Sequence, residues 1–172
     1  MLLVCALIIL GVVALDQITK WIVMLNMELG QSVPLWEDVF HFTYIRNPGA
    51  SFGSFSENRW VFMVISTVMI VGMIFYLVKY RPTQKLMYIP ISMIIGGGIG
   101  NMIDRLFYGE SFGNGTVVDF LDFCAFPNLW QWIFNVADSF VVVGAGMLFV
   151  YLFIDIVKEE KSKRIAKNQK ED

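Results

Sequence analysis

Long apolar runs separated by short polar stretches dominate the pattern of this chain of 172 residues. Four of these runs are long enough to cross a bilayer as α-helices, which takes about 20 residues each. Backbone N–H and C=O groups must bond internally in lipid, so helices are the only sensible form for these runs. We therefore predict an all-α membrane protein with helices over residues 2–25, 60–78, 86–103 and 133–157, the third broken by Pro90.

Between the first two predicted helices, residues 26–59 have a different pattern. Residues 39–45 (VFHFTYI) are rich in aromatic and β-branched side chains, which favour β-structure. The sequence Asn-Pro-Gly-Ala at 47–50 is typical of a turn. We expect a short strand or hairpin in this segment.

A second non-membrane segment is predicted at residues 104–132. It contains a Gly-Asn-Gly turn at 113–115 and then a short β-like run at 116–120. The aromatic stretch at 123–133 (FCAFPNLWQWI) is typical of a short helix lying at a membrane interface.

The basic residues indicate how the helices are oriented. Lys79, Arg81 and Lys85 crowd the connection between the second and third runs, and six more of the 13 Lys and Arg residues follow residue 157. By the positive-inside rule this side is cytoplasmic, and four spans then place both termini there. All five tryptophans map near the opposite, extracytoplasmic boundary, where such side chains are favoured: Trp21, Trp36, Trp60, Trp130 and Trp132.

Composition agrees with one membrane-embedded domain over residues 1–157 and a charged cytoplasmic tail over 158–172. Hydrophobic residues make up 56% of the chain and charged residues 16%, which is typical of an integral membrane protein. The tail is expected to be a solvated helix end or disordered, with binding of anionic lipid as the alternative. A net charge of -2 gives no basic field for nucleic acid. Nothing in the sequence demands an oligomer, so we predict a monomer.

Three residue types limit the chemistry. His41 is the single histidine, which argues against a His-rich zinc peptidase, and we predict no metal and no cofactor. Cys5 and Cys124 lie at different predicted depths, so we expect no disulfide. The first apolar run has no Lys or Arg before Lys20, which favours a retained span over a cleaved signal peptide.

Asp119 and Asp138 are the candidate catalytic residues. Both lie beside predicted spans, in VVDF (117–120) and FNVADSF (134–140), where an ionisable group is costly and therefore indicates function. Two carboxylates that share a site cannot both ionise easily, so one proton divided between them gives an acid and a base. This is the chemistry of aspartic peptidases. The alternative for Asp138 alone is an acid that merely stabilises a helix start.

Asp16 and Lys20 share one helix face at the i, i+4 spacing. We interpret them as a structural ion pair near the end of the first span, and a direct part in substrate binding is the alternative. Neither reading depends on Asp119.

Asn101, Asp104 and Arg105 end the third run, after the glycines of GGGIGNMIDR (96–105). Small residues in a membrane favour close helix packing. The sharper alternative is that this bare surface also admits a lipid chain or an extended peptide. Arg105 could bind a carbonyl or phosphate, or hold a carboxylate.

Other nucleophiles are weaker candidates. A Ser–Lys pair would have to combine Lys20 with Ser51 or Ser139, and a Ser–His or Cys–His pair has only His41 in a predicted outer strand. Asn135 lies at i−3 from Asp138 and points the same way. The polar neighbours therefore favour the aspartate pair.

Five segments together resemble the bacterial lipoprotein signal peptidase (signal peptidase II) family, in order, spacing and membrane placement. They are DQITK (16–20), NPGASFG (47–53), GGGIGNMIDR (96–105), VVDF (117–120) and FNVADSF (134–140). The resemblance implies four transmembrane helices with a small extracytoplasmic β-cradle in the bacterial cytoplasmic membrane.

The resemblance also implies an activity: removal of the signal peptide from diacylglyceryl-modified prolipoproteins, just before the lipidated cysteine. It assigns the catalytic pair to Asp119 and Asp138. Membrane lipid and globomycin-type inhibitors are the other implied partners. Contacts with substrate or inhibitor are implied for Asn47, Asn101, Arg105 and Asn135, and structural support of the site for Asp16, Lys20, Asp104 and Gly49.

Two other functions remain open from the residues. A proton-coupled transporter would use Asp16, Asp104 and Asp138 as a relay through the membrane. A non-catalytic relative would bind lipoproteins without cutting them, although binding alone would not require the aspartate pair.

Overall fold

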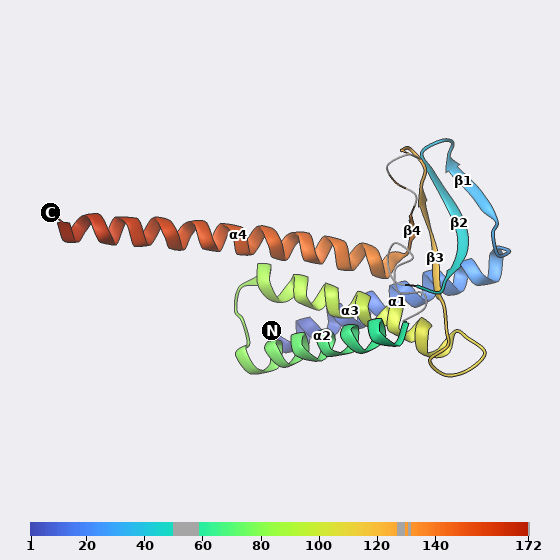
Figure 1. Ribbon diagram of the computed structural model, residues 1–172, viewed down its shortest axis with the longest axis horizontal. Coiled ribbons are helices and arrows are strands. Elements are labelled where there is room, and N and C mark those ends of the chain that lie inside the picture. The colour runs from blue at the N-terminus through green and yellow to red at the C-terminus, as the bar shows by residue number, and fades with distance from the viewer. Residues whose placement is uncertain (50–58, 127–129, 131, 172) are drawn as a thin grey trace.

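The computed structural model describes residues 1–49, 59–126, 130 and 132–171, without the side chains of 59, 162 and 164–171. Within these residues it contains four long helices and one small antiparallel sheet at one end of the helices (Figure 1). The helices are α1 (Leu2–Asn26), α2 (Arg59–Tyr80), α3 (Lys85–Phe107) and α4 (Val136–Glu171).

The four predicted spans are confirmed, because each helix contains a stretch long and apolar enough to cross a membrane. Two predicted ends were wrong. The third helix runs four residues past residue 103, so Asp104 and Arg105 are helical rather than terminal. The fourth begins at Val136 instead of 133, because Ile133 and Phe134 pair with a neighbouring strand.

The predicted break at Pro90 was also wrong, since α3 is continuous through this residue. Proline removes one backbone N–H donor and disfavours a helix interior. In a membrane, neighbouring helices supply enough packing to tolerate it. Pro90 is fully buried, and a Cβ built on Gly144 of α4 would lie 2.9 Å from its carbonyl oxygen, so α4 packs closely on this turn.

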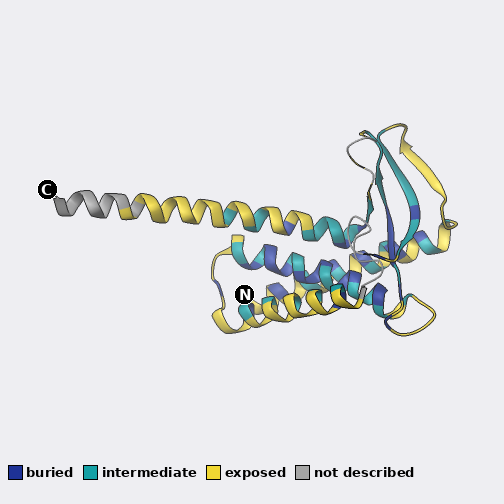
Figure 2. Ribbon diagram, viewed as in Figure 1, coloured by how far each residue is buried: buried dark blue, intermediate teal, exposed yellow. Residues whose placement is uncertain are grey.

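Helix α3 is the centre of the bundle and contacts α1, α2 and α4. Its glycines make this possible, because a Cβ on Gly96 would meet the side chain of Val12 in α1 and one on Gly97 the carbonyl oxygen of Ala137 in α4. The other helices leave most of their apolar surface exposed (Figure 2), as expected for faces that contact lipid. The close-packing interpretation of the glycine run is thereby supported at these positions.

The sheet has the strand order β1-β2-β3-β4, with every neighbouring pair antiparallel. Strands β1 (Ser32–Trp36) and β2 (Phe40–Asn47) form the hairpin predicted for this segment. Strand β3 (Val117–Phe123) extends the predicted run by three residues, and β4 is the short pair Ile133–Phe134.

The predicted interfacial helix at 123–133 is replaced at both ends by strand, at Phe123 and Ile133. Residues 127–129 and 131 of that segment lie outside the described residues. Strand pairing accounts for the difference, since Ile133 is the register partner of Asp122.

A hydrophobic cluster packs the sheet against the helices. Val23 of α1 packs with Tyr44 of β2 and with Val118 and Phe120 of β3, all of them buried. Full burial of a Val or Phe side chain contributes roughly 1.5–3 kcal/mol to stability. This cluster holds the start of β3 over the ends of the helices, where the polar residues gather.

The charged tail continues α4 as a helix to Glu171 and extends beyond the other helices (Figure 1). This agrees with the helical alternative for the tail rather than the disordered one. Its Glu159–Lys163 ion pair is largely exposed. Cys5 and Cys124 are both free, so the expectation of no disulfide is confirmed.

Candidate active site

Polar side chains from five elements converge where the helices meet the sheet. Asp119 comes from β3 and Asp138 from the first turn of α4. Almost all of these side chains are shielded from solvent, although the helices around them are apolar. The others are Asp16 and Lys20 of α1, Asn47 of β2, and Asn101, Asp104 and Arg105 of α3, with Asn135 between β4 and α4.

The Asp119 carboxylate is held by two amide groups. Asn135 Nδ2 donates to Oδ1 at 2.6 Å, and Asn47 Nδ2 donates to Oδ2 at 2.9 Å. Burial and then the negative charge of Asp138 raise the pKa of Asp119 from 3.8 to about 7, against the lowering effect of the two amides. Asp119 therefore exchanges a proton near neutral pH.

Asp138 is held in a comparable way. Asn101 Nδ2 donates to its Oδ1 at 2.7 Å, and the backbone N–H of Asn135 donates to its Oδ2 at 3.2 Å. In return the backbone N–H of Asp138 donates to Asn135 Oδ1 at 2.9 Å, a reciprocal cap at the start of α4. Asp138 therefore does cap the start of α4, as the alternative interpretation proposed. Its carboxylate also accepts from Asn101 and interacts electrostatically with Asp119, so capping is not its whole environment.

Asn135 links the two carboxylates directly. Its side-chain amide donates to the Asp119 carboxylate, and its backbone N–H donates to the Asp138 carboxylate. The side chain also donates to Asn101 Oδ1 at 3.0 Å and accepts from the backbone N–H of Asp138. It has no exposed surface, so these bonds cannot be replaced by water without opening the site. The two aspartates are therefore presented to one another in a single hydrogen-bonded group.

Lys20 of α1 contacts this hydrogen-bonded group through Asn101. Its ammonium lies 2.9 Å from both Asp16 and Asp104 and donates to Asn101 Oδ1 at 3.0 Å. All three donors of the ammonium are thereby used in a fully buried setting. Because Asn101 presents its oxygen to Lys20, its amide nitrogen is left to face Asp138.

Asp16 and Asp104 each connect Lys20 to the backbone that carries a catalytic candidate. Asp16 Oδ1 accepts from the N–H of Ala137 at 3.0 Å, one residue before Asp138. Asp104 Oδ2 accepts from the N–H of Val118 at 3.0 Å, one residue before Asp119. The ion group thus fixes the positions of both catalytic candidates through the main chain.

Arg105 lies beside the pair and, within the part of the chain that the structure describes, forms no salt bridge with a carboxylate. Its guanidinium donates to the backbone oxygen of Asn101 at 3.0 Å and of Gly49 at 3.2 Å, and stacks 4.8 Å from the ring centre of Phe62. Gly49 N–H donates to Asn47 Oδ1 at 3.0 Å, which directs the Asn47 amide toward Asp119. Gly49 and Arg105 therefore help to orient Asn47 at the end of β2.

Comparison with known proteins agrees with this geometry. The family model described as signal peptidase (SPase) II matches residues 8–154. The chain belongs to the signal peptidase II family. It is accordingly a protease, and the resemblance of its five motifs is confirmed.

Curated relatives of the signal peptidase II family cover nearly the whole chain. The lipoprotein signal peptidase of Bacillus subtilis (strain 168) is 40% identical over 152 residues, 88% of this chain and 94% of the relative. The lipoprotein signal peptidase of Brevibacillus brevis (strain 47) is 42% identical over 146 residues, 84% of this chain and 91% of the relative.

A solved bacterial membrane enzyme, determined by the in meso method at 2.3 Å resolution, has the same fold, with a TM-score of 0.79, 31% identity and 89% coverage of both chains. A second such structure at 1.9 Å gives a TM-score of 0.74 and 31% identity, covering 87% of this chain and 92% of that one. Four helices with a small sheet are thus an established arrangement for a membrane enzyme.

Gln17 is the residue that motif reasoning overlooked in this signal peptidase II chain. Its amide nitrogen donates to Asp16 at 3.1 Å and Asp104 at 2.9 Å, and its oxygen accepts from the Tyr108 hydroxyl at 3.0 Å. Gln17 thus donates additional hydrogen bonds to the two carboxylates that form ion pairs with Lys20. The available signal was its place in the polar group of an otherwise apolar helix.

The geometry weighs against the Ser–Lys alternative. Lys20 is an ammonium bound to two carboxylates, and the Ser139 hydroxyl donates to the backbone oxygen of Asn135 at 3.0 Å. Ser51 lies outside the described residues. A transporter relay fares no better, because Asp16 and Asp104 share one lysine instead of spanning the membrane depth.

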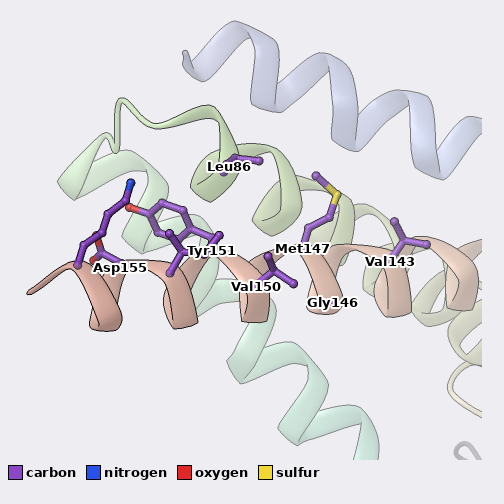
Figure 3. Close-up of a pocket in the computed structure, with 9 residues that line it drawn as sticks. Leu86, Val143, Gly146, Met147, Val150, Tyr151 and Asp155 are labelled. Carbon is purple, nitrogen blue, oxygen red and sulfur yellow. The ribbon is translucent and has the colours of Figure 1, made fainter. Parts of the chain in front are cut away.

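One hollow of about 430 Å³ lies elsewhere, between the start of α3 and the middle of α4 (Figure 3). Its lining includes Leu86, Val143, Met147, Tyr151 and Asp155. None of the polar residues around Asp119 and Asp138 lines it. The candidate active site is therefore the polar group around Asp119 and Asp138, and this hollow lies apart from it on the apolar surface of α3 and α4.

Proposed function

We propose that Asp119 and Asp138 activate a water molecule that hydrolyses the peptide bond before the diacylglyceryl-modified cysteine of a prolipoprotein. The observation that carries this proposal is that Asn135 donates to both carboxylates, to Asp119 from its side chain and to Asp138 from its backbone N–H, with a pKa of about 7 for Asp119. Such a pair holds one proton near neutral pH, which makes it an acid and a base together.

Proton transfer then follows a balanced route. The ionised aspartate takes a proton from water, whose oxygen attacks the scissile carbonyl carbon, while the protonated aspartate donates to the carbonyl oxygen. When the tetrahedral intermediate collapses, the C–N bond breaks and the aspartate that is now protonated gives its proton to the leaving amine, while the other aspartate takes a proton from a hydroxyl of the intermediate. The pair returns to its starting state with one proton, and the reaction uses only water and the substrate.

The surrounding amides have distinct roles in this proposal. Asn101 and Asn135 keep the two carboxylates in register, and Asn47 holds Asp119 from the side of β2. Arg105 and the loop at Gly49 would meet the extended substrate backbone as it crosses the site. Globomycin-type peptides would bind across the same residues and cover the pair.

Lipid anchoring would supply much of the substrate affinity. Each acyl CH₂ transferred from water contributes about 0.8 kcal/mol, and the helices beside the site leave their apolar faces exposed. The bond to be cut would thus be selected by its depth and by the attached lipid. Precursor that lacks diacylglycerol should be cleaved far more slowly, and equal rates would contradict this selection.

The proposed setting is the bacterial cytoplasmic membrane, with both termini inside and the active site at the extracytoplasmic face. The positive-inside distribution supports it, and so do Trp21, Trp36 and Trp60, which are exposed near the end of the bundle that carries the sheet. We also propose action as a monomer, because the hydrogen bonds of Asp119 and Asp138 are completed by residues of the same chain.

The test is cleavage of a purified diacylglyceryl-modified precursor by the wild type, Asp119→Asn and Asp138→Asn, with EDTA present throughout. Each substitution should lower turnover at least about a thousandfold, within the range of general acid–base catalysis. Asp155→Asn on the exposed face of α4 is the matched control and should cleave like the wild type.

Cleavage by wild type and Asp155→Asn alone would support the aspartate pair. Near-normal cleavage by either site variant would reject the assignment of that residue. Since asparagine is nearly isosteric with a protonated aspartic acid, all four proteins should share one thermal unfolding midpoint within a few degrees at pH 5, below the pKa of Asp119. This measurement separates lost chemistry from lost fold.

A further inference from the structure

A second group of reactive side chains lies on the sheet, at the end remote from the aspartate pair. His41 and Asp122 are register partners on β2 and β3, so their side chains leave the same face. Cys124 follows Asp122 by two residues and therefore points the same way. Its backbone N–H donates to Val39 at 2.9 Å, which keeps it beside β2 after β3 has ended.

One ligand atom from each of these three residues lies within 4.8 Å of the other two. Ligand atoms around a tetrahedral zinc ion stand roughly 3.3–3.8 Å apart, given bonds of about 2.0–2.3 Å. A small side-chain rotation of Cys124 or His41 closes the difference of roughly 1 Å. All three side chains are partly exposed, so an ion can reach them.

The histidine has an unused nitrogen. His41 Nδ1 contacts the Ser32 hydroxyl at 3.3 Å, while Nε2 is shielded from solvent and has no hydrogen-bond partner among the residues that the structure describes. A shielded nitrogen without a partner is costly and needs an explanation. A metal ion on Nε2 would supply the missing interaction.

The outer contacts have the form found around metal ligands. Thr43 donates to Asp122 Oδ2 at 2.7 Å and exchanges a 2.8 Å hydrogen bond with Ser32, which in turn contacts His41. Such partners orient the imidazole and the carboxylate before the ion arrives. Packing alone would not require this row of hydrogen-bonded polar side chains, because apolar side chains could fill the same face of the sheet.

We propose that His41, Asp122 and Cys124 bind a zinc ion. Thiolate and imidazole are soft or borderline ligands that favour Zn²⁺ over Mg²⁺ or Ca²⁺, which prefer oxygen. On binding, the Cys124 thiol releases its proton to solvent, and water fills the fourth position. This proposal departs from the sequence prediction of no metal, which overlooked these ligands because their spacing of 41, 122 and 124 matches no common zinc motif.

The ion would act as a clamp and not as part of the peptidase chemistry. Asp122 lies three residues from Asp119 along β3, roughly 10 Å at 3.3 Å per residue. Zinc would join the beginning of β2 to the end of β3, and so restrain the strand that carries Asp119. Activity without zinc should persist, whereas the stability of the sheet should depend on it.

The test uses full-length Cys5→Ala protein in detergent, in which Cys124 is the single thiol. Added ZnCl₂ should bind in a ratio of one per chain, slow alkylation of Cys124 at least about tenfold and raise the thermal unfolding midpoint. CoCl₂ should give the absorption bands of a thiolate-bound tetrahedral ion. Wild-type protein should behave in the same way, because Cys5 is buried in α1.

His41→Gln and Asp122→Asn, each in the Cys5→Ala background, should lose zinc protection of Cys124. Glu37→Gln in the exposed β1–β2 turn is the matched control and should retain it. Zinc binding that survives both ligand substitutions, or alkylation that zinc does not slow, would overturn the proposal. Unfolding midpoints without zinc show whether a variant is folded, and a misfolded one is replaced by His41→Asn.

Discussion

At the scale of single residues, the proposed active site places ionisable side chains where they are shielded from solvent. Asp119 is 2% exposed and Lys20 fully buried, yet each has its polar atoms bound by named partners. Desolvation disfavours the ionised form of Asp119, while Asn47 and Asn135 favour it. The balance leaves the carboxyl able to gain or lose a proton near pH 7.

The pH dependence of cleavage should report this balance. Turnover requires one proton on the pair, so kcat/KM should fall as pH rises through about 7, the pKa of Asp119. Asn47→Ala removes a hydrogen bond that favours the ionised form, so the falling limb should move to higher pH. Rates from pH 5 to 9 on the lipidated precursor test this, and a limb that moves down would contradict it.

Stability should change over the same range. The pKa of Asp119 is about 7 in the fold and 3.8 as a free side chain, so the folded protein holds a proton that the unfolded chain releases. This contribution is complete below about pH 4 and is lost as pH rises through 7. The unfolding midpoint should fall between pH 5 and 8 in the wild type, and less so in Asp119→Asn.

At the scale of elements, α3 determines how closely the helices approach. Its glycines allow backbone contact with α4 and leave room for Asp16 of α1 beside Gly100. That room is needed because Asp16 reaches past α3 to the first turn of α4. The ion group and the helix packing are therefore parts of one arrangement.

Gly100→Ala should destabilise this arrangement, because the new methyl carbon would stand 2.5 Å from Asp16 Oδ2. Overpacking of this kind costs about 1–3 kcal/mol. Gly11→Ala on α1 is the matched control, since a Cβ there meets nothing within 4 Å, and it should be neutral or slightly stabilising. Thermal unfolding in detergent distinguishes them, and equal midpoints would count against the close approach.

Lys20→Met should be more damaging, since it leaves Asp16 and Asp104 buried without a cation. Removing one partner of a buried ion pair costs about 3–5 kcal/mol. Lys163→Met, which removes the exposed pair with Glu159, should leave the unfolding midpoint unchanged. Folded yield and unfolding midpoint are the measurements. A folded but inactive Lys20→Met protein would instead assign Lys20 to the chemistry.

At the scale of the whole molecule, the sheet and the charged tail lie at opposite ends of the bundle (Figure 1). The ends of α1 and α3 and the beginning of α4 meet at the sheet, which places the aspartates at that end of the bundle. The basic residues of the 2–3 connection and of the tail lie at the other.

This arrangement predicts the outcome of labelling in intact cells. In a Cys5→Ala, Cys124→Ala background, Glu37→Cys in the β1–β2 turn should react with a membrane-impermeant thiol reagent. Lys158→Cys near the inner end of α4 should react only after permeabilisation. Both positions are exposed, so access to the reagent depends on sidedness alone. The reverse pattern would overturn the proposed orientation.

The sequence by itself determined the four spans, the strand-forming segments at 39–45 and 116–120 and the family, because hydropathy and short motifs are local properties of the chain. It also singled out Asp119, Asp138 and the polar residues near them, since ionisable groups stand out in an apolar background. These features need no knowledge of which segments meet.

Only the tertiary structure decided which partners these residues have. Lys20 forms an ion pair with Asp104, 84 positions away in the sequence. The Asn135 side chain donates a hydrogen bond to Asp119, which lies on strand β3. The start of α4 at Val136 depends on pairing between β3 and β4. Each of these three features depends on contacts between segments that are distant in the sequence. The pattern of apolar residues determines which faces are buried, but it does not determine which polar groups meet across the bundle.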